Sequence, residues 1–114
     1  MRHFNSRIAG VSQRNEDGSN RQDYVKQHAK VGEELLMVPE PYNPYSPAAV
    51  ALFVVRQGRK GKEAYQLGYV PDDTARTLHQ IWSEGHRVKV SISELTGGTR
   101  DQPTRGVNLL FVVE

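Results

Sequence analysis

The chain of 114 residues has the length of one ordinary domain, and the absence of cysteine excludes disulfides and thiolate metal sites. Its 15 Lys and Arg residues against 13 Asp and Glu give a net charge of +2, which excludes strong nonspecific attraction to nucleic acid by the whole-molecule field. The longest apolar run, residues 48–55, is too short to span a bilayer, and residues 1–7 lack the apolar segment of a signal peptide, so we expect a soluble, cytoplasmic protein without membrane contact.

The first part of the chain predicts a strand, a turn and a short helix. Residues 7–13 favour a first strand, and Asn-Glu-Asp-Gly at 15–18 favours a turn, because these residue types tolerate unusual backbone angles. Ser19 and Gln22 have the spacing of a capping box, which predicts a helix over about residues 20–30.

The middle of the chain predicts three strands, a stiff loop and a basic hairpin. Residues 33–38 favour the second strand, and four prolines make residues 39–47 a stiff loop, since each proline fixes φ and removes a backbone donor. The continuous apolar run at 48–55 is typical of a central strand that is buried on both faces. Residues 56–62 are expected at a basic hairpin tip, followed by a fourth strand over 64–70.

The last part of the chain predicts a second helix and two more strands. Residues 71–74 begin the helix with an acidic first turn, which suits the positive end of the helix dipole. A strictly alternating strand over 87–93 and a final strand over 107–113 flank a long polar loop at 96–106. Six strands and two short helices in this order indicate a mainly β single domain over 1–114, built as a small antiparallel barrel without exposed edges.

Five blocks stand in order along nearly the whole chain: Ile-Ala-Gly-Val at 8–11, Asp-Gly-Ser-Asn-Arg-Gln at 17–22, Gly-Glu-Glu-Leu at 32–35, Glu-Pro-Tyr-Asn-Pro-Tyr at 40–45 and Leu-Gly-Tyr-Val-Pro at 67–71. Together they resemble the HIRAN domain family. The resemblance implies that the six-stranded barrel is a modified OB-like one. It also implies a binding module for single-stranded nucleic acid, in particular DNA with a free 3′ end, linked to DNA repair or processing.

The family's ligand-contacting loop has the form Asn-Pro-Tyr-Asp, which this chain matches with Asn43 and Tyr45 but not with Ser46. The resemblance implies that Tyr45 stacks on a base, and that Ser46 replaces an aspartate that helps to hold the terminal nucleotide. From the residues alone, Tyr42 is expected to pack the loop onto the barrel, and Asn43 to organise its own turn. All four residues are candidates for the nucleic-acid site.

Three further positions depart from the family's pattern. The family's basic–aromatic pair on the first strand falls near Ser12 and Gln13 of this chain, and Arg14 lies one residue away. A basic residue is usual in the family at the position of Asp72. Because a shift of one residue on a strand moves a side chain to the other face, Arg14 does not simply replace the missing charge. Gln13 and Arg14 are candidate nucleic-acid contacts, and recognition of a 3′ end stays open.

Two sets of cations lie in the expected loops. Arg100 and Arg105 belong to the long polar loop, which either closes over a bound strand or is only a solvated connection. The densest basic cluster is expected to be a solvated hairpin tip rather than a phosphate track, and it consists of Arg56, Arg59, Lys60 and Lys62.

The sequence offers no basis for catalysis. The four histidines are dispersed, so no metal site is expected, and Asp72 and Asp73 suit the start of a helix better than paired catalytic carboxylates. We therefore expect a non-catalytic module without cofactor, whose partner is single-stranded nucleic acid. The alternative is a protein-interaction domain that has lost the nucleic-acid pocket and presents its proline-rich loop to a protein partner.

Overall fold

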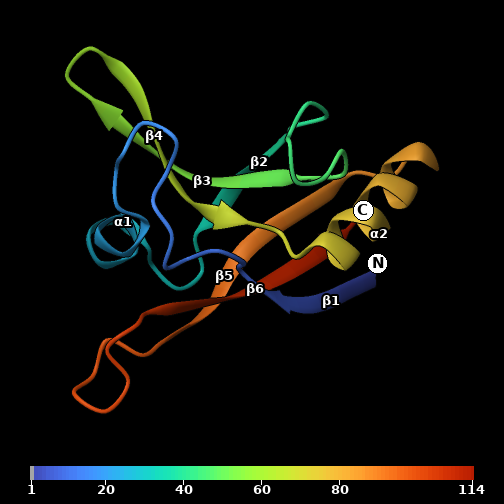
Figure 1. The fold of residues 1–114 in the computed structure, drawn as a ribbon. Helices are drawn as coiled ribbons and strands as arrows, with labels where there is room; N and C mark the ends of the chain where they lie inside the picture. Colours follow the sequence, from blue (N-terminus) through green and yellow to red (C-terminus); the bar gives the residue numbers. More distant parts are fainter. Residues whose placement is uncertain (1) are drawn as a thin grey trace.

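The computed structural model describes residues 2–114, which form six strands and two helices (Figure 1). The mainly β class and the number and order of the predicted elements are confirmed. In chain order the elements are β1 (Arg2–Arg7), α1 (Arg21–His28), β2 (Glu34–Pro39), β3 (Val50–Gly58), β4 (Gly61–Tyr69), α2 (Asp72–Ser83), β5 (Val88–Thr96) and β6 (Gly106–Val113).

The strands form one antiparallel sheet in the order β1-β6-β5-β2-β3-β4. Its two outer strands meet at a single bridge just beyond β1, where Ala9 and Tyr69 exchange backbone hydrogen bonds of 2.7 and 2.9 Å. This close approach requires glycine at position 68, because φ is +154° there and an added Cβ would lie 2.5 Å from the carbonyl oxygen of Ala9. The sheet curls into an OB-like form, but it does not close into the complete barrel that we expected.

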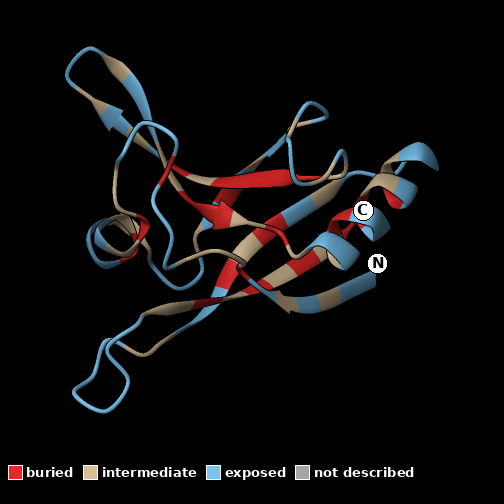
Figure 2. Ribbon diagram, viewed as in Figure 1, coloured by how far each residue is buried: buried red, intermediate tan, exposed pale blue. Residues whose placement is uncertain are grey.

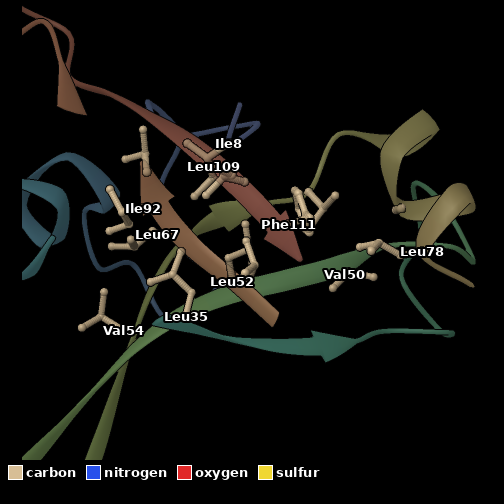
Figure 3. Close-up of a cluster of buried hydrophobic side chains, with 14 of the residues drawn as sticks. Ile8, Leu35, Val50, Leu52, Val54, Leu67, Leu78, Ile92, Leu109 and Phe111 are labelled. Atoms are coloured by element: carbon tan, nitrogen blue, oxygen red, sulfur yellow. The ribbon is translucent and has the colours of Figure 1, made fainter. Parts of the chain in front are cut away.

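The core lies on the inner face of the sheet (Figures 2 and 3). Strand β6 alternates strictly, with Leu109 and Phe111 among its fully buried residues. In β3, residues 50–52 are consecutively buried, which confirms the central strand expected from the apolar run. Helix α2 covers one end of this core with an apolar stripe that includes Ala75 and Leu78.

The first strand lies earlier than predicted. Instead of residues 7–13, β1 comprises Arg2–Arg7 and pairs with β6 along its whole length. Phe4 stacks on Phe111, with ring centroids 4.9 Å apart, and this contact with the core stabilises an otherwise polar strand. Residues 10–13 form a turn, closed by a hydrogen bond of 3.0 Å from the Gln13 N–H to the Gly10 carbonyl.

The predicted capping box is wrong, because another residue caps α1. The Asn20 side chain accepts a hydrogen bond from the backbone N–H of Asp23, at 3.1 Å. The Ser19 hydroxyl instead donates to Asp17, at 2.6 Å, and Gln22 reaches two loops. None of the helices in the described part of the chain is long and apolar enough to cross a membrane.

Candidate nucleic-acid interface

The proline-rich loop between β2 and β3 is organised by Asn43. Its side-chain oxygen accepts hydrogen bonds from the N–H groups of Tyr45, at 2.9 Å, and Ser46, at 3.3 Å, and its amide donates to Glu40 at 3.0 Å. This is the Asx turn that the residues predicted. It leaves both tyrosine rings in solvent, with Tyr42 96% and Tyr45 95% exposed. The expectation that Tyr42 packs onto the barrel is therefore wrong.

The same loop is attached to the start of α2. The Ser46 hydroxyl donates to Asp72 at 2.5 Å and accepts from the Ala48 N–H at 3.2 Å, and a ring nitrogen of His79 lies 3.0 Å from the Ala48 carbonyl. The hydrogen bond from Ser46, followed by that from Arg76, lowers the pKa of Asp72. A negative charge therefore stands beside the tyrosine-bearing loop.

A chain of contacts links this loop to the turn after β1. Glu40 accepts both the Asn43 amide and the Tyr69 hydroxyl, the latter at 2.8 Å. The guanidinium carbon of Arg21 lies 5.3 Å from the centroid of the Tyr69 ring, and its nitrogens donate to Asn15, at 2.7 Å, and to the turn after β1. These side chains hold the two loops in a fixed relation.

Arg21 is the main structural residue of this region that sequence analysis missed. It is only 6% exposed, and burial lowers the pKa of its guanidinium. Its position at the first turn of a helix looks like a solvated charge in the sequence. Its partners Asn15, Gly10 and Tyr69 are up to 48 residues away from it, so no local pattern indicated the burial.

Gln13 and Arg14 lie in the turn after β1, where both side chains are exposed. Arg14 donates to the Gly18 carbonyl at 3.0 Å, which directs its guanidinium along the turn. Since residues 10–13 form a turn and not a strand, a shift of one residue does not move a side chain to the opposite face of a sheet here.

Arg105 is anchored by its backbone, which exchanges hydrogen bonds of 2.7 and 2.9 Å with the side chain of Gln22. The Gln22 amide also donates to Val11, so the base of the 97–105 loop is joined to the turn after β1. Arg100 is exposed near the tip of the same loop. In Figure 1 this tip and the loop with Tyr45 lie at opposite ends of the molecule, so the long loop does not close over the tyrosines.

The basic hairpin is longer than expected, because β3 and β4 continue through most of it and leave only Arg59 and Lys60 in the turn. These two and Lys62 are exposed. Arg56 is not part of a solvated tip: it forms a salt bridge with Glu33 and donates to the His28 carbonyl at 2.6 Å. One member of the predicted cluster is thus a structural residue.

The remaining polar candidates have structural partners. Asp73 accepts the Thr74 N–H at 2.8 Å in the first turn of α2, as expected for a helix start. Within residues 2–114, no group of three or more His, Cys, Asp or Glu side chains is arranged to hold a metal ion.

Comparisons with known proteins agree with this geometry. Residues 1–102 match the model of the HIRAN domain, a family of nucleic-acid-binding domains. The fold is similar to the crystal structure of the HIRAN domain of human HLTF, with a TM-score of 0.57 and 13% identity over 96% of this chain and 74% of that chain. It is also similar to a structure of a protein from Lactobacillus plantarum, with a TM-score of 0.61 and 14% identity over 99% of both chains. No curated protein sequence matches this chain.

Proposed function

This chain belongs to the HIRAN domain family, and from that premise we propose that it is a non-catalytic module that binds single-stranded nucleic acid through its proline-rich loop. One observation carries the proposal: two aromatic rings, Tyr42 and Tyr45, are almost wholly exposed on a loop whose backbone is fixed by hydrogen bonds. Stacking of a base on such a ring contributes about 1–3 kcal/mol and tolerates any base.

The other candidate residues extend this site in two directions. Asn43 and Ser46 lie beside the rings and offer polar groups to a nucleotide that stacks there.

In the other direction, the contacts through Glu40, Tyr69 and Arg21 lead to Gln13 and Arg14. We propose that a longer strand follows this path and then reaches Arg105 and Arg100, so that their guanidinium groups bind its phosphates. The same proposal includes four finer points. The preferred strand is DNA, its 3′ end is recognised, the protein is linked to DNA repair or processing, and its location is cytoplasmic.

Fluorescence anisotropy with a short labelled DNA strand tests the proposal. We expect Tyr45→Ala to weaken binding by about tenfold, the equivalent of one lost stacking contact. Tyr45→Phe is the matched control: it keeps the ring, and we expect it to keep the affinity. Because the ring is 95% exposed, neither change should alter the thermal unfolding midpoint.

Two results would contradict this function. Affinity that is undetectable at low salt would end the proposal of nucleic-acid binding, and equal affinity of the Tyr45→Ala variant would remove this ring from the site. A strand blocked at its 3′ hydroxyl tests the finer point. If blocking has no effect on affinity, the domain binds strands without recognising the end.

A protein-interaction domain is the second candidate. It is favoured by the carboxylate of Asp72 beside the loop and by exposed apolar side chains on β2 and β3, which include Leu36 at 47%, Val38 at 37% and Val55 at 37%. Light scattering and co-purification test it. A stable homodimer or a stoichiometric partner would support this candidate, and a monomer that binds DNA firmly without a partner would contradict it.

A further inference from the structure

A polar groove of about 530 Å³ is lined by residues of β1, β6 and β5 and by Gln102 of the 97–105 loop, and no residue of the loop that carries Tyr45 lines it. Arg7 of β1 and Asn108 of β6 are register partners, and Asn108 alternates with the buried Val107 and Leu109, so its side chain lies on the face away from the core. Thr96 ends β5 at the same groove. All the side chains that line the groove are polar, and Arg7 is its one charged group.

Two buried polar atoms in this groove lack hydrogen-bond partners. Within residues 2–114, the only buried side-chain oxygens or nitrogens without a partner are Thr96 Oγ1 and Asn108 Oδ1, and both residues line the groove. The nitrogen of the Asn108 amide donates a hydrogen bond to Glu94 at 3.0 Å, which leaves Oδ1 as an acceptor without a partner. Unpaired buried polar atoms are costly, and two of them in one place indicate a site for a hydrogen-bonding ligand.

Glycine at position 106 allows the Thr96 side chain to pack against its backbone. An added Cβ there would lie 2.5 Å from Thr96 Oγ1 and 3.6 Å from a terminal nitrogen of Arg7. The hydroxyl and the guanidinium therefore both lie close to Gly106, where a larger residue would displace the Thr96 side chain. One small ligand in the groove can contact both groups.

The groups in the groove define the class of ligand. A guanidinium binds a phosphate, and the free acceptor on Asn108 requires a donor such as a hydroxyl. No aromatic side chain lines the groove, so it cannot hold a base by stacking. The internal backbone of DNA has phosphates but no hydroxyl, whereas ribose supplies a 2′-hydroxyl that both donates and accepts. We propose that this groove binds a ribose phosphate, either as a free ribonucleotide or as part of an RNA strand.

Nitrogen-15 NMR titration with adenosine 5′-monophosphate tests the proposal independently of the Tyr45 site. We expect chemical-shift changes at Ser93, Thr96 and Asn108, with millimolar affinity typical of few polar contacts. The matched probe is 2′,3′-dideoxyadenosine 5′-monophosphate, which differs only in its missing hydroxyls. It should bind about fivefold more weakly, because it leaves Thr96 and Asn108 unpaired. Equal affinity of the two probes, or no shift at these residues, would overturn the proposal.

Variants separate a ligand site from a merely structural groove. Arg7→Gln should weaken binding of the ribonucleotide about tenfold, since the phosphate loses its cation. Thr96→Val keeps the shape and removes the hydroxyl, so it should weaken binding without lowering the thermal unfolding midpoint. Arg59→Gln, at the turn between β3 and β4, is the control and should bind as the parent does. Parent-like affinity in both groove variants would exclude the site.

A last pair of titrations identifies the source of the ribose phosphate. The Tyr45→Ala variant weakens binding at the proposed strand site, and shifts of Ser93, Thr96 and Asn108 then report binding at the groove. In this variant, a short RNA that shifts the groove residues while the matching DNA does not would assign the groove to an RNA strand. If neither strand shifts them while the ribonucleotide does, the groove is a site for the free nucleotide. If DNA shifts them as strongly as RNA, the ribose preference is wrong.

Discussion

At the scale of single residues, two departures from the pattern that the resemblance implies lie in contact with each other. The resemblance implies an aspartate at position 46 and a basic residue at position 72, and this chain has serine and aspartate there. The structure brings Ser46 and Asp72 into direct contact, so the carboxylate stands on the helix and links it to the loop. Position 72 therefore carries a negative charge, which repels a phosphate.

Asp72→Asn should therefore increase the affinity for single-stranded DNA by about threefold at low salt, because a charge that repels phosphate is removed. Asparagine still accepts the hydrogen bond from Ser46, so the loop keeps its anchor. The gain should disappear at high salt, where the charge is screened. Asp101→Asn in the 97–105 loop is the control, with a strand of about four nucleotides that covers the tyrosines alone. Anisotropy titrations at two salt concentrations provide the measurement, and an equal gain in both variants would contradict a local effect.

The pH dependence of binding follows from the same residue. The pKa of Asp72 lies below its ordinary value because of Ser46 and Arg76, so the carboxylate stays ionised throughout the neutral and mildly acidic range. Its interactions with these two residues stabilise the fold above the unfolded-state pKa, and this contribution is lost as the pH falls through the lowered native pKa. Repulsion of phosphate by Asp72 therefore does not change between about pH 5 and pH 8.

At the scale of elements, apolar patterning predicted the strands well, and contacts distant in sequence decided the rest. The apolar run in β3 and the alternation in β5 indicated their burial correctly, because each pattern is local. Strand β1 was missed because Phe4 is its single apolar residue and its pairing with β6 is a contact of distant segments. The Asx turn at Asn43 was predictable from its neighbours, whereas the buried position of Arg21 was not.

The bridge between the two outer strands gives a prediction for β4. Gly68→Ala should destabilise the fold by about 2 kcal/mol or more, since the added Cβ would lie 2.5 Å from the Ala9 carbonyl oxygen and separate the strands. Gly32→Ala is the matched control: φ is +89° there but the space is open, so strain alone should cost about 1 kcal/mol. Urea unfolding measures both. Equal losses would show that the bridge adds nothing to stability.

At the scale of the whole molecule, the charge is too small and too scattered for a strong electrostatic attraction to strands. The net charge is +2, Arg56 is neutralised by Glu33, and the tips with Arg59 and Arg100 lie away from the loop that carries Tyr45. The composition indicated this weak field correctly. It did not indicate which cations the fold brings near the tyrosines, because that depends on how the hairpins extend from the sheet.

This arrangement predicts a salt dependence that changes with strand length. A strand of about four nucleotides covers the tyrosines alone, so the slope of log Kobs against log salt should be shallower than about −1. A strand of about twelve nucleotides also reaches Arg14, Arg105 and Arg100, and three phosphate contacts at about −0.7 each give a slope of about −2. Anisotropy between low and moderate salt measures both slopes. Equal slopes would remove the three arginines from the strand's path, and a slope steeper than about −4 would mean that the basic β3–β4 hairpin also binds phosphate.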